Sequence, residues 1–340
     1  MRRSRLVAAV VAALAAALAS AGCGGGGDGG ADETRRLTLY SGRSEELVGP
    51  LYDRFERATG IRVEARYGDS AELAATIGEE GAGSPAEAFF SQDAGALGAV
   101  AAEGRLQPLP QELLRRVDAR FRDPEGRWVG ASGRARVVAY DKRKLRPAEL
   151  PDSILAFTDP RWRGRIGLAP TNASFQAFVS AMRLSVGDAR TRAWLEGIER
   201  NRPVLLENNI QTLEAIAREE VEVGFVNHYY LYELRAERPD LPVENHFTRP
   251  GDPGSLVNVS GIGLLDDSPE ARRFAEFLLD VEGQRYFATD TNEYPLLSGV
   301  RPDESLRPLA EIQGPDVRLG QLGAKLPSTV ELIREAGLTQ

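Results

Sequence analysis

The chain has 340 residues, with 42 Lys and Arg against 50 Asp and Glu, and a formal net charge of −8. This length allows two domains with separate cores, and the acidic balance argues against nucleic-acid partners and against polybasic membrane binding. With only 2 His, 1 Cys and 2 Met, a zinc, copper or nickel site built from imidazole or sulfur ligands is poorly supplied. Oxygen donors, in contrast, are abundant.

The N-terminus has the pattern of an export signal. Arginines at positions 2, 3 and 5 precede an apolar, alanine-rich stretch over residues 6–19, which predicts a signal peptide over 1–22. Cys23, the single cysteine, follows small residues and resembles a bacterial lipobox, although Ser20 stands where leucine is usual. We expect cleavage before Cys23, lipidation of Cys23 and a glycine-rich tether over 23–36. An ordinary secreted protein with an incidental cysteine is the alternative.

Cleavage at that point removes three arginines and lowers the formal net charge to −11. Such a charge mildly favours a cationic ligand. No second cysteine is present to form an intramolecular disulfide.

Strand and helix patterns alternate along the rest of the chain. Predicted strands cover 37–40, 61–67, 86–91, 137–140, 166–169 and 224–226. Predicted helices cover 45–57, a segment beginning at residue 70, 94–102 and segments near 175–183, 191–199 and 212–219. This alternation predicts an α/β fold with mostly parallel sheets.

Two adjacent tyrosines, Tyr229 and Tyr230, follow the buried strand over 224–226. Ligands of open α/β folds bind outside the carboxyl ends of strands. Neighbouring residues of a regular strand face opposite ways, so the two phenols converge only if the backbone turns there. Phenolate oxygen is a hard anionic donor, which suits a trivalent ion such as Fe³⁺. On the pair alone, one core tyrosine and one solvated tyrosine is the favoured interpretation, and only the rest of the chain reverses this preference.

Five short motifs follow one another along the chain, and their order and spacing together are more specific than any one of them. They are Leu37–Arg43, Ile77–Gly81 with Ser84–Gln92, Gly133–Tyr140, Ala169–Phe175 and Asn227–Tyr230. In these segments the chain resembles the periplasmic-type ferric-ion-binding proteins of ABC iron importers, a transferrin-like family of solute-binding proteins. The resemblance runs from about Leu37 almost to the C-terminus.

The resemblance implies a two-lobed periplasmic-binding-protein fold of type II, with the ligand cleft between lobes that crossover strands join. We expect the crossings near residues 130–137 and 257–264. The first lobe then comprises 37–132 and 262–340, and the second lobe 133–261. Whether the C-terminal helices reach both lobes is left open.

The resemblance also implies the iron ligands. Tyr229 and Tyr230 match the family's tyrosine pair, and Tyr140 matches a third tyrosine ligand of one branch. Three phenolates would neutralise the charge of one Fe³⁺. The alternative for Tyr140 is a half-buried aromatic residue of a strand.

The first lobe departs from the best-known branch of the family. Ser44 stands in the place of a histidine ligand and Gln92 in the place of a carboxylate ligand. A carboxylate from Glu45 or Asp93 could still approach the metal, but Glu45 also suits the solvated first turn of a helix, and we expect neither to be a ligand. We therefore expect a site built mainly from the second lobe.

An anion is expected to complete the coordination. Arg43 lies between the first strand and the first helix, where its guanidinium could clamp carbonate through two hydrogen bonds. A helix N-terminus at 171–174 would favour an anion, and Asn209 and Asn227 match anion-binding positions of some family members. The candidate anion-binding residues are Arg43, Thr171, Asn172, Ala173, Ser174, Asn209 and Asn227. Plain helix capping by Asn172, Ser174 and Asn209 is the alternative, and carbonate, phosphate and citrate are left open.

The sequence thus predicts a monomeric extracytoplasmic lipoprotein on the bacterial cell membrane. It captures Fe³⁺ with carbonate or another synergistic anion and delivers it to an ABC permease and its ATPase. The alternative is the same fold holding a small organic anion or a polyamine. Enzymatic activity is disfavoured, because neither a nucleophile elbow nor a phosphate-cradling glycine loop stands out.

Overall fold

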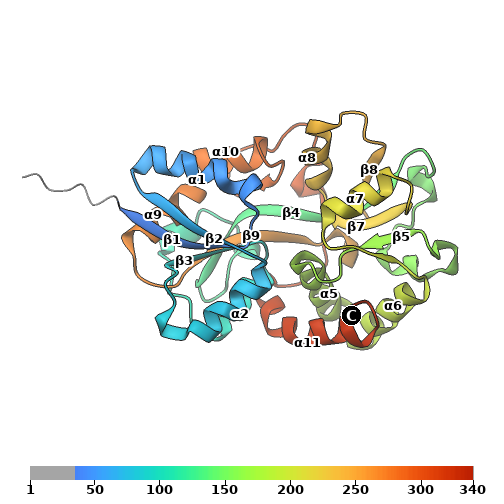
Figure 1. The fold of residues 1–340 in the computed structure, drawn as a ribbon, viewed down its shortest axis with the longest axis horizontal. Coiled ribbons are helices and arrows are strands. Elements are labelled where there is room, and N and C mark those ends of the chain that lie inside the picture. Colours follow the sequence, from blue (N-terminus) through green and yellow to red (C-terminus); the bar gives the residue numbers. More distant parts are fainter. Residues whose placement is uncertain (1–34, 340) are drawn as a thin grey trace, which may run out of the picture. The chain divides into compact units, whose positions relative to one another are not determined.

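The computed structural model describes residues 35–339 (Figure 1). The predicted signal peptide, Cys23 and most of the tether lie outside the described residues. No helix in the described range combines the length and apolar character that crossing a membrane requires.

The strands are β1 (Arg36–Ser41), β2 (Arg62–Tyr67), β3 (Ala88–Ser91), β4 (Trp128–Asp141), β5 (Ile166–Leu168), β6 (Val204–Leu205), β7 (Val223–Asn227), β8 (Val243–His246), β9 (Val257–Leu264) and β10 (Tyr294–Pro295). The helices are α1 (Glu45–Thr59), α2 (Ser70–Glu80), α3 (Ala94–Ala102), α4 (Gln111–Leu114), α5 (Ala173–Val186), α6 (Asp188–Arg200), α7 (Asn209–Ala217), α8 (Tyr230–Glu237), α9 (Pro269–Leu278), α10 (Val281–Thr289) and α11 (Leu322–Glu335). The predicted α/β class is confirmed.

Strand pairing is mixed, which corrects the expectation of mostly parallel sheets. The strand order is β2-β1-β3-β9-β4-β7-β5-β6, with β8 and β10 also paired to β4. The outer strands pair in parallel through helical crossovers, as β1 does with β2 and β3 and β5 with β6 and β7. Every pair that includes β4 or β9 is antiparallel. The alternation of strands and helices predicted only residues 137–140 of β4, and the crossover strands near 130–137 and 257–264 were expected from the family resemblance alone.

β4 joins two groups of strands (Figure 1). Its first part, Trp128–Ala135, pairs with β9, and its second part, Arg136–Tyr140, pairs with β7. We refer to β1, β2, β3, β9 and β10 as the first sheet and to β5, β6, β7 and β8 as the second sheet. All fourteen residues of β4 are buried, so any charged side chain on this strand needs partners inside the protein.

The helices cover the sheets with their apolar sides. In α1 the residues at helical spacing, Val48, Leu51, Tyr52 and Phe55, are buried. The C-terminal helix α11 packs against both α3 and α5, and Ser180 of α5 donates to Thr329 of α11 at 2.9 Å. The lobe boundaries at residues 132/133 and 261/262 stay a prediction.

Candidate functional site: a cavity lined by tyrosines

The tyrosine pair lies where the chain turns from β7 into α8. β7 ends at Asn227, Tyr229 has helical backbone angles (φ −71°, ψ −26°), and α8 begins at Tyr230. This turn removes the opposite facing that a continued strand would impose. The two rings consequently lie 4.1 Å apart between centroids, at an interplanar angle of 31°. The local geometry that convergence of the phenols requires is therefore present.

The two hydroxyls have different surroundings. Tyr229 is fully buried, and its hydroxyl forms no well-aligned hydrogen bond within the described chain, although the Tyr230 hydroxyl is a close polar neighbour. The hydroxyl of Tyr230 accepts a hydrogen bond from Nε2 of Gln92 at 3.1 Å. Burial raises the pKa of Tyr230 well above its ordinary value, the neighbouring Tyr229 adds to the rise, and two arginines, Arg43 and Arg134, oppose it. A buried polar group without a partner is costly, so the Tyr229 hydroxyl is the strongest local indication of a missing ligand.

Arg43 lies against the pair, but its guanidinium already has a partner. Its Nη2 and Nη1 atoms lie 2.9 and 3.4 Å from Oε1 and Oε2 of Glu293, and both side chains are buried. Burial alone would lower the pKa of Arg43, but Glu293 and the phenols of Tyr229 and Tyr230 raise it. The expected role of Arg43 as a free anion clamp is therefore corrected: the group balances the buried Glu293 carboxylate.

Two more arginines, Arg134 and Arg136, project from β4 into this interior. Nη1 of Arg136 lies 3.3 Å from Oγ of Ser174 and 3.4 Å from Oδ1 of Asn227. Burial lowers the pKa of Arg136 to about 9, although Tyr230 raises it. The three guanidinium nitrogens of Arg134 have no hydrogen-bond partner among the described residues, and its Nε is 4.0 Å from Glu293. The interior beside the phenols is thus rich in positive charge.

The predicted anion-binding residues of the second sheet come together around Arg136. Oδ1 of Asn172 accepts from the backbone N–H and the hydroxyl of Ser174 at 3.1 and 2.6 Å. Nδ2 of Asn209 reaches Asn172 and Ser174 at 3.4 and 3.5 Å, and its Oδ1 accepts from the N–H of Asn227 at 3.3 Å. These four residues form one polar cluster at the N-termini of α5 and α7.

The helix ends refine this part of the site. Asn172 caps α5, as the capping alternative held, but the residue that caps α7 is Asn208 rather than Asn209. The carbonyl of Thr171 accepts from Gln176 at 3.1 Å, and Ala173 is the buried first residue of α5. The free N–H groups at this helix end would favour an anion bound beside them.

A cavity of about 490 Å³ opens beside the tyrosine pair. Its lining residues are Gly42, Arg43, Ser44, Leu47, Tyr67, Gly68, Asp69, Gln92, Asn172, Glu207, Asn208, Tyr229 and Tyr230. Both sheets contribute, so Ser44 and Gln92 of the first sheet share a cavity with the phenols, as the resemblance implied. Glu45 does not line the cavity: it is exposed in the first turn of α1, as its solvated alternative held.

The structure contradicts the prediction that Tyr140 is a third ligand. Tyr140 pairs with Val223, the first residue of β7, whereas the tyrosine pair follows Asn227, the last residue. Four residues of strand, about 13 Å, separate these two levels. Tyr140 is absent from the cavity lining and lies in the main apolar core. Sequence spacing placed it on a strand but could not show which end of the neighbouring strand it would meet.

Sequence reasoning missed Tyr67, Asp69, Arg134, Arg136 and Glu293. The two arginines lie within a motif that was recognised, and two charged residues at alternate positions of a buried strand are the signal that could have marked them. The Tyr67-Gly68-Asp69 loop follows a predicted strand, as the tyrosine pair does. Glu293 carried no local signal, since its partner Arg43 is 250 positions away.

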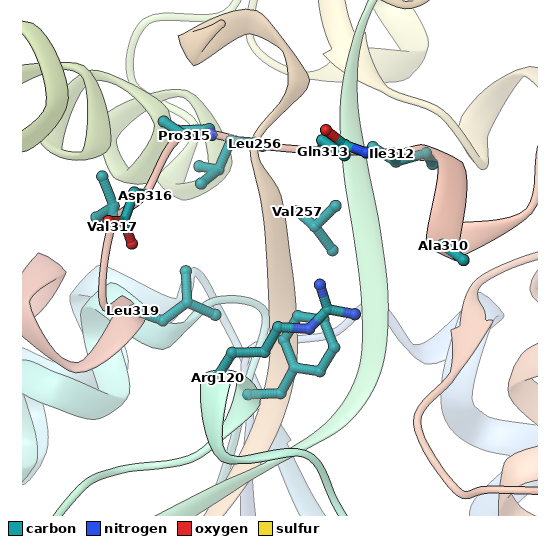
Figure 2. A pocket seen from close by; sticks show the side chains of 12 residues that line it. Arg120, Leu256, Val257, Ala310, Ile312, Gln313, Pro315, Asp316, Val317 and Leu319 are labelled. Atoms are coloured by element: carbon teal, nitrogen blue, oxygen red, sulfur yellow. The ribbon is translucent and has the colours of Figure 1, made fainter. Parts of the chain in front are cut away.

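A second cavity, of about 360 Å³, shares no lining residue with the first. Figure 2 shows Arg120 on one side of it, Leu256 and Val257 behind it, and the segment from Ala310 to Leu319 around it. It contains no phenol and a single carboxylate, that of Asp316. Across residues 35–339, moreover, no group of three or more His, Cys, Asp and Glu side chains is placed to hold a metal. The tyrosine-lined cavity is therefore the candidate site.

Known proteins resemble this chain over most of its length. Residues 82–312 match the family model for bacterial extracellular solute-binding proteins. The major ferric iron-binding protein of Neisseria meningitidis is 34% identical over 309 residues, covering 89% of this chain and 93% of the relative. This chain belongs to the ferric iron-binding solute-binding proteins. The family is one of transport proteins, not enzymes.

Solved structures of the family share the fold. Iron-bound HitA from Pseudomonas aeruginosa superposes with a TM-score of 0.85 at 33% identity, covering 89% of this chain and 99% of HitA. The Trichodesmium protein IdiA (FutA), solved with iron and citrate, gives a TM-score of 0.77 at 30% identity, covering 89% of this chain and all of that protein. The expected periplasmic-binding-protein fold is thereby confirmed.

Proposed function

We propose that this member of the family captures one Fe³⁺ through the phenolates of Tyr229 and Tyr230 and delivers it to an ABC permease. The observation that carries the proposal is the buried Tyr229 hydroxyl, which lacks a well-aligned hydrogen-bond partner. The ring of Tyr229 lies next to that of Tyr230, with 4.1 Å between the ring centroids. A trivalent cation would replace the two phenolic protons and supply the partner that the Tyr229 oxygen lacks. The iron-bound relatives support this choice of cargo.

Positive charge around the pair favours its ionised form. Arg43 lies 5.9 Å from the Tyr229 ring centroid, and the charges of Arg43 and Arg134 act to lower the pKa of Tyr230. In a low-dielectric interior such charges interact more strongly than they do in water. The arginines therefore offset part of the cost of two adjacent phenolates before the metal is bound.

The synergistic anion is proposed to bind at Arg136 and the cluster of Asn172, Ser174, Asn209 and Asn227. Arg136 has an unpartnered Nε atom, and the N-terminus of α5 adds backbone donors. The citrate of the Trichodesmium relative and the cavity volume of about 490 Å³ support an anion as large as citrate, and carbonate would also fit.

The second candidate cargo is a small organic anion without iron. Arg136 and the asparagine cluster favour it, but it gives the hydroxyl of Tyr229 no charged partner. A polyamine is disfavoured, because Arg43, Arg134 and Arg136 already place three cations around the phenols.

Metal analysis decides between these cargoes. The purified chain, loaded with ferric iron in buffer with and without bicarbonate, should retain one iron per chain and show a phenolate-to-iron absorption band in the visible. Organic-anion binding without iron retention, or iron retention without the band, would contradict the proposal.

The export route is proposed to end in lipidation of Cys23. Mass spectrometry of the native protein should find an N-terminal diacylglyceryl cysteine, and Cys23→Ala should release the protein from the membrane fraction. An unmodified N-terminus elsewhere would support the ordinary secreted alternative.

A further inference from the structure

The first sheet brings a loop with its own phenol to the cavity. Tyr67, Gly68 and Asp69 connect β2 to α2, and all three line the same cavity as Tyr229 and Tyr230. β1 and β2 are parallel, with Ser41 paired to Tyr67, so their carboxyl ends meet at one edge of the sheet. The hydrogen bond from the N–H of Gly68 to the carbonyl of Ser41, at 3.1 Å, extends this alignment into the loop.

Tyr67 is held in place through its ring, while its hydroxyl is free. The ring stacks on that of Tyr52 at 6.3 Å and 14°, and the hydroxyl of Tyr52 is bonded to that of Ser41 at 2.8 Å. The hydroxyl of Tyr67 makes no hydrogen bond to the described residues. A fixed ring with an unengaged oxygen at the edge of a cavity is the arrangement that a ligand requires.

The loop is also tied to its neighbours. The hydroxyl of Ser70 accepts from the N–H of Gln92 at 2.9 Å and donates to the carbonyl of Gly42 at 3.4 Å. Asp69 caps α2 by accepting from the N–H of Ala71 at 2.8 Å. The three loops that follow β1, β2 and β3 therefore form one connected rim of the cavity.

Among the cavity residues of the first sheet, only Tyr67 and Asp69 have side-chain oxygens that can become anionic. Oδ1 of Asp69 is engaged in capping α2, which restrains the orientation of this carboxylate. Ser44 and Gln92 are neutral, and Arg43 is paired with Glu293. Tyr67 is therefore the best available partner for a hard trivalent cation on this side.

The geometry points to Tyr67 as the first-sheet ligand of the iron, in the cavity that it shares with Tyr229 and Tyr230. This inference rests on the proposed function and deepens it. Two phenolates leave one positive charge on Fe³⁺, and the phenolate of Tyr67 neutralises it. Burial, together with the negative charges of Glu45, Asp53 and Glu46, raises the pKa of Tyr67 to about 12, so the cation itself has to displace the phenolic proton.

If each sheet supplies an iron ligand, iron binding would favour the closed arrangement of the two sheets. A ligand shifts open and closed populations only if it binds one of them better. An iron–Tyr67 bond would form only when the two sheets lie close together, so it would add to the affinity of iron for the closed arrangement.

Tyr67→Phe tests the inference, with Tyr140→Phe as the matched control because Tyr140 loses the same oxygen outside the cavity. Relative to wild type, Tyr67→Phe should keep one iron but shift the visible band, release iron to a competing chelator at least tenfold faster, and lose the iron-induced decrease in radius of gyration. Tyr140→Phe should match wild type in all three measurements. If the two variants behave alike, Tyr67 is not a ligand.

Two further variants distinguish failure of the Tyr67 ligand role from failure of the proposed iron-binding function. If Tyr229→Phe/Tyr230→Phe retains the band, the proposed function fails, whatever Tyr67 does. If Tyr67→Phe melts at a lower temperature than wild type in the apo form, Tyr67→His provides the second test, since imidazole can bind the metal without a phenol. A ligand role predicts that Tyr67→His recovers part of the lost iron affinity, and no recovery over Tyr67→Phe would overturn it.

Discussion

Arg43 and Glu293 form a fully buried ion pair across 250 positions of sequence, with Nη2 and Oε1 2.9 Å apart. Ser132 also donates to Glu293, at 2.8 Å, and Arg43 lies within 6 Å of the rings of Phe90 and Tyr229. The pair joins the loop after β1 to the segment before β10 and holds the Arg43 guanidinium beside Tyr229.

Breaking this pair should be costly. Glu293→Gln leaves the Arg43 charge buried without compensation and should lower the free energy of unfolding by about 3–5 kcal/mol. Urea unfolding of the apo protein measures the change. The double replacement Arg43→Met/Glu293→Leu should be less destabilising than Glu293→Gln, because no unpaired charge is left. A loss below about 1 kcal/mol in Glu293→Gln would show that the pair is dispensable for stability.

Arg136 should determine the response to the anion. Arg136→Met removes the charged donor beside Ser174 and Asn227 and should weaken iron binding about tenfold in bicarbonate, in line with one charged hydrogen bond. Without a synergistic anion the loss should be much smaller. Competition with a chelator in the two buffers measures both values, and Arg66→Met, on the surface, is the control. Equal losses in the two buffers would assign Arg136 a structural role only.

Gln92 offers a gain-of-function test. Its Nε2 lies 3.1 Å from the Tyr230 hydroxyl, so Gln92→Glu places a hard, anionic oxygen donor close to the proposed iron site. Iron affinity should rise, and Gln92→Leu should lower it several-fold by removing the hydrogen bond. Isothermal titration against a ferric chelate gives both affinities. An affinity for Gln92→Glu no higher than wild type would place the iron out of reach of position 92.

The buried carboxyl of Asp93, next to the cavity residue Gln92, should make the stability of the fold depend on pH. Burial raises the pKa of Asp93 to about 6, while the N–H groups of Ala96 and Gly95 and the charge of Arg134 oppose the rise. Because the native pKa lies above the unfolded value of about 3.9, the protonated form stabilises the fold fully below pH 4. This contribution is lost as the pH rises through 6.

The expected loss between pH 4 and pH 7 is about 2–3 kcal/mol. Asp93→Asn keeps the side-chain oxygen that caps α3 but cannot ionise. Its free energy of unfolding should therefore not fall between pH 4 and pH 7 through ionisation at position 93. Unfolding of both proteins at pH 4.5 and 7.5 measures the difference in slope. Parallel pH profiles for wild type and Asp93→Asn would contradict the assignment.

The sequence was informative where function depends on local order. A buried strand followed by two tyrosines predicts phenols at the end of a strand, and the structure has β7, a turn and α8 at that place. Asn172, Ser174, Asn209 and Asn227 could be grouped only through the family motifs, and their hydrogen bonds now connect them.

The failures share one physical cause, because strand register and long-range pairing are not local properties. Tyr140 lies on a correctly predicted strand but meets the wrong end of β7. Arg43 lies in the predicted loop, but its charge is balanced by Glu293, which no spacing rule connects to it. Tyr67 ends a predicted strand, yet only the parallel pairing of β1 with β2 brings it to the cavity.

The account depends most directly on the two phenolates, and a visible spectrum with metal analysis of wild type and Tyr229→Phe/Tyr230→Phe tests them together. Both proteins are loaded with ferric iron in bicarbonate buffer, and circular dichroism confirms that the fold is retained. We expect one iron per chain and a phenolate-to-iron band in wild type, with both lost in the double variant. Iron and the band retained in the double variant would contradict the account.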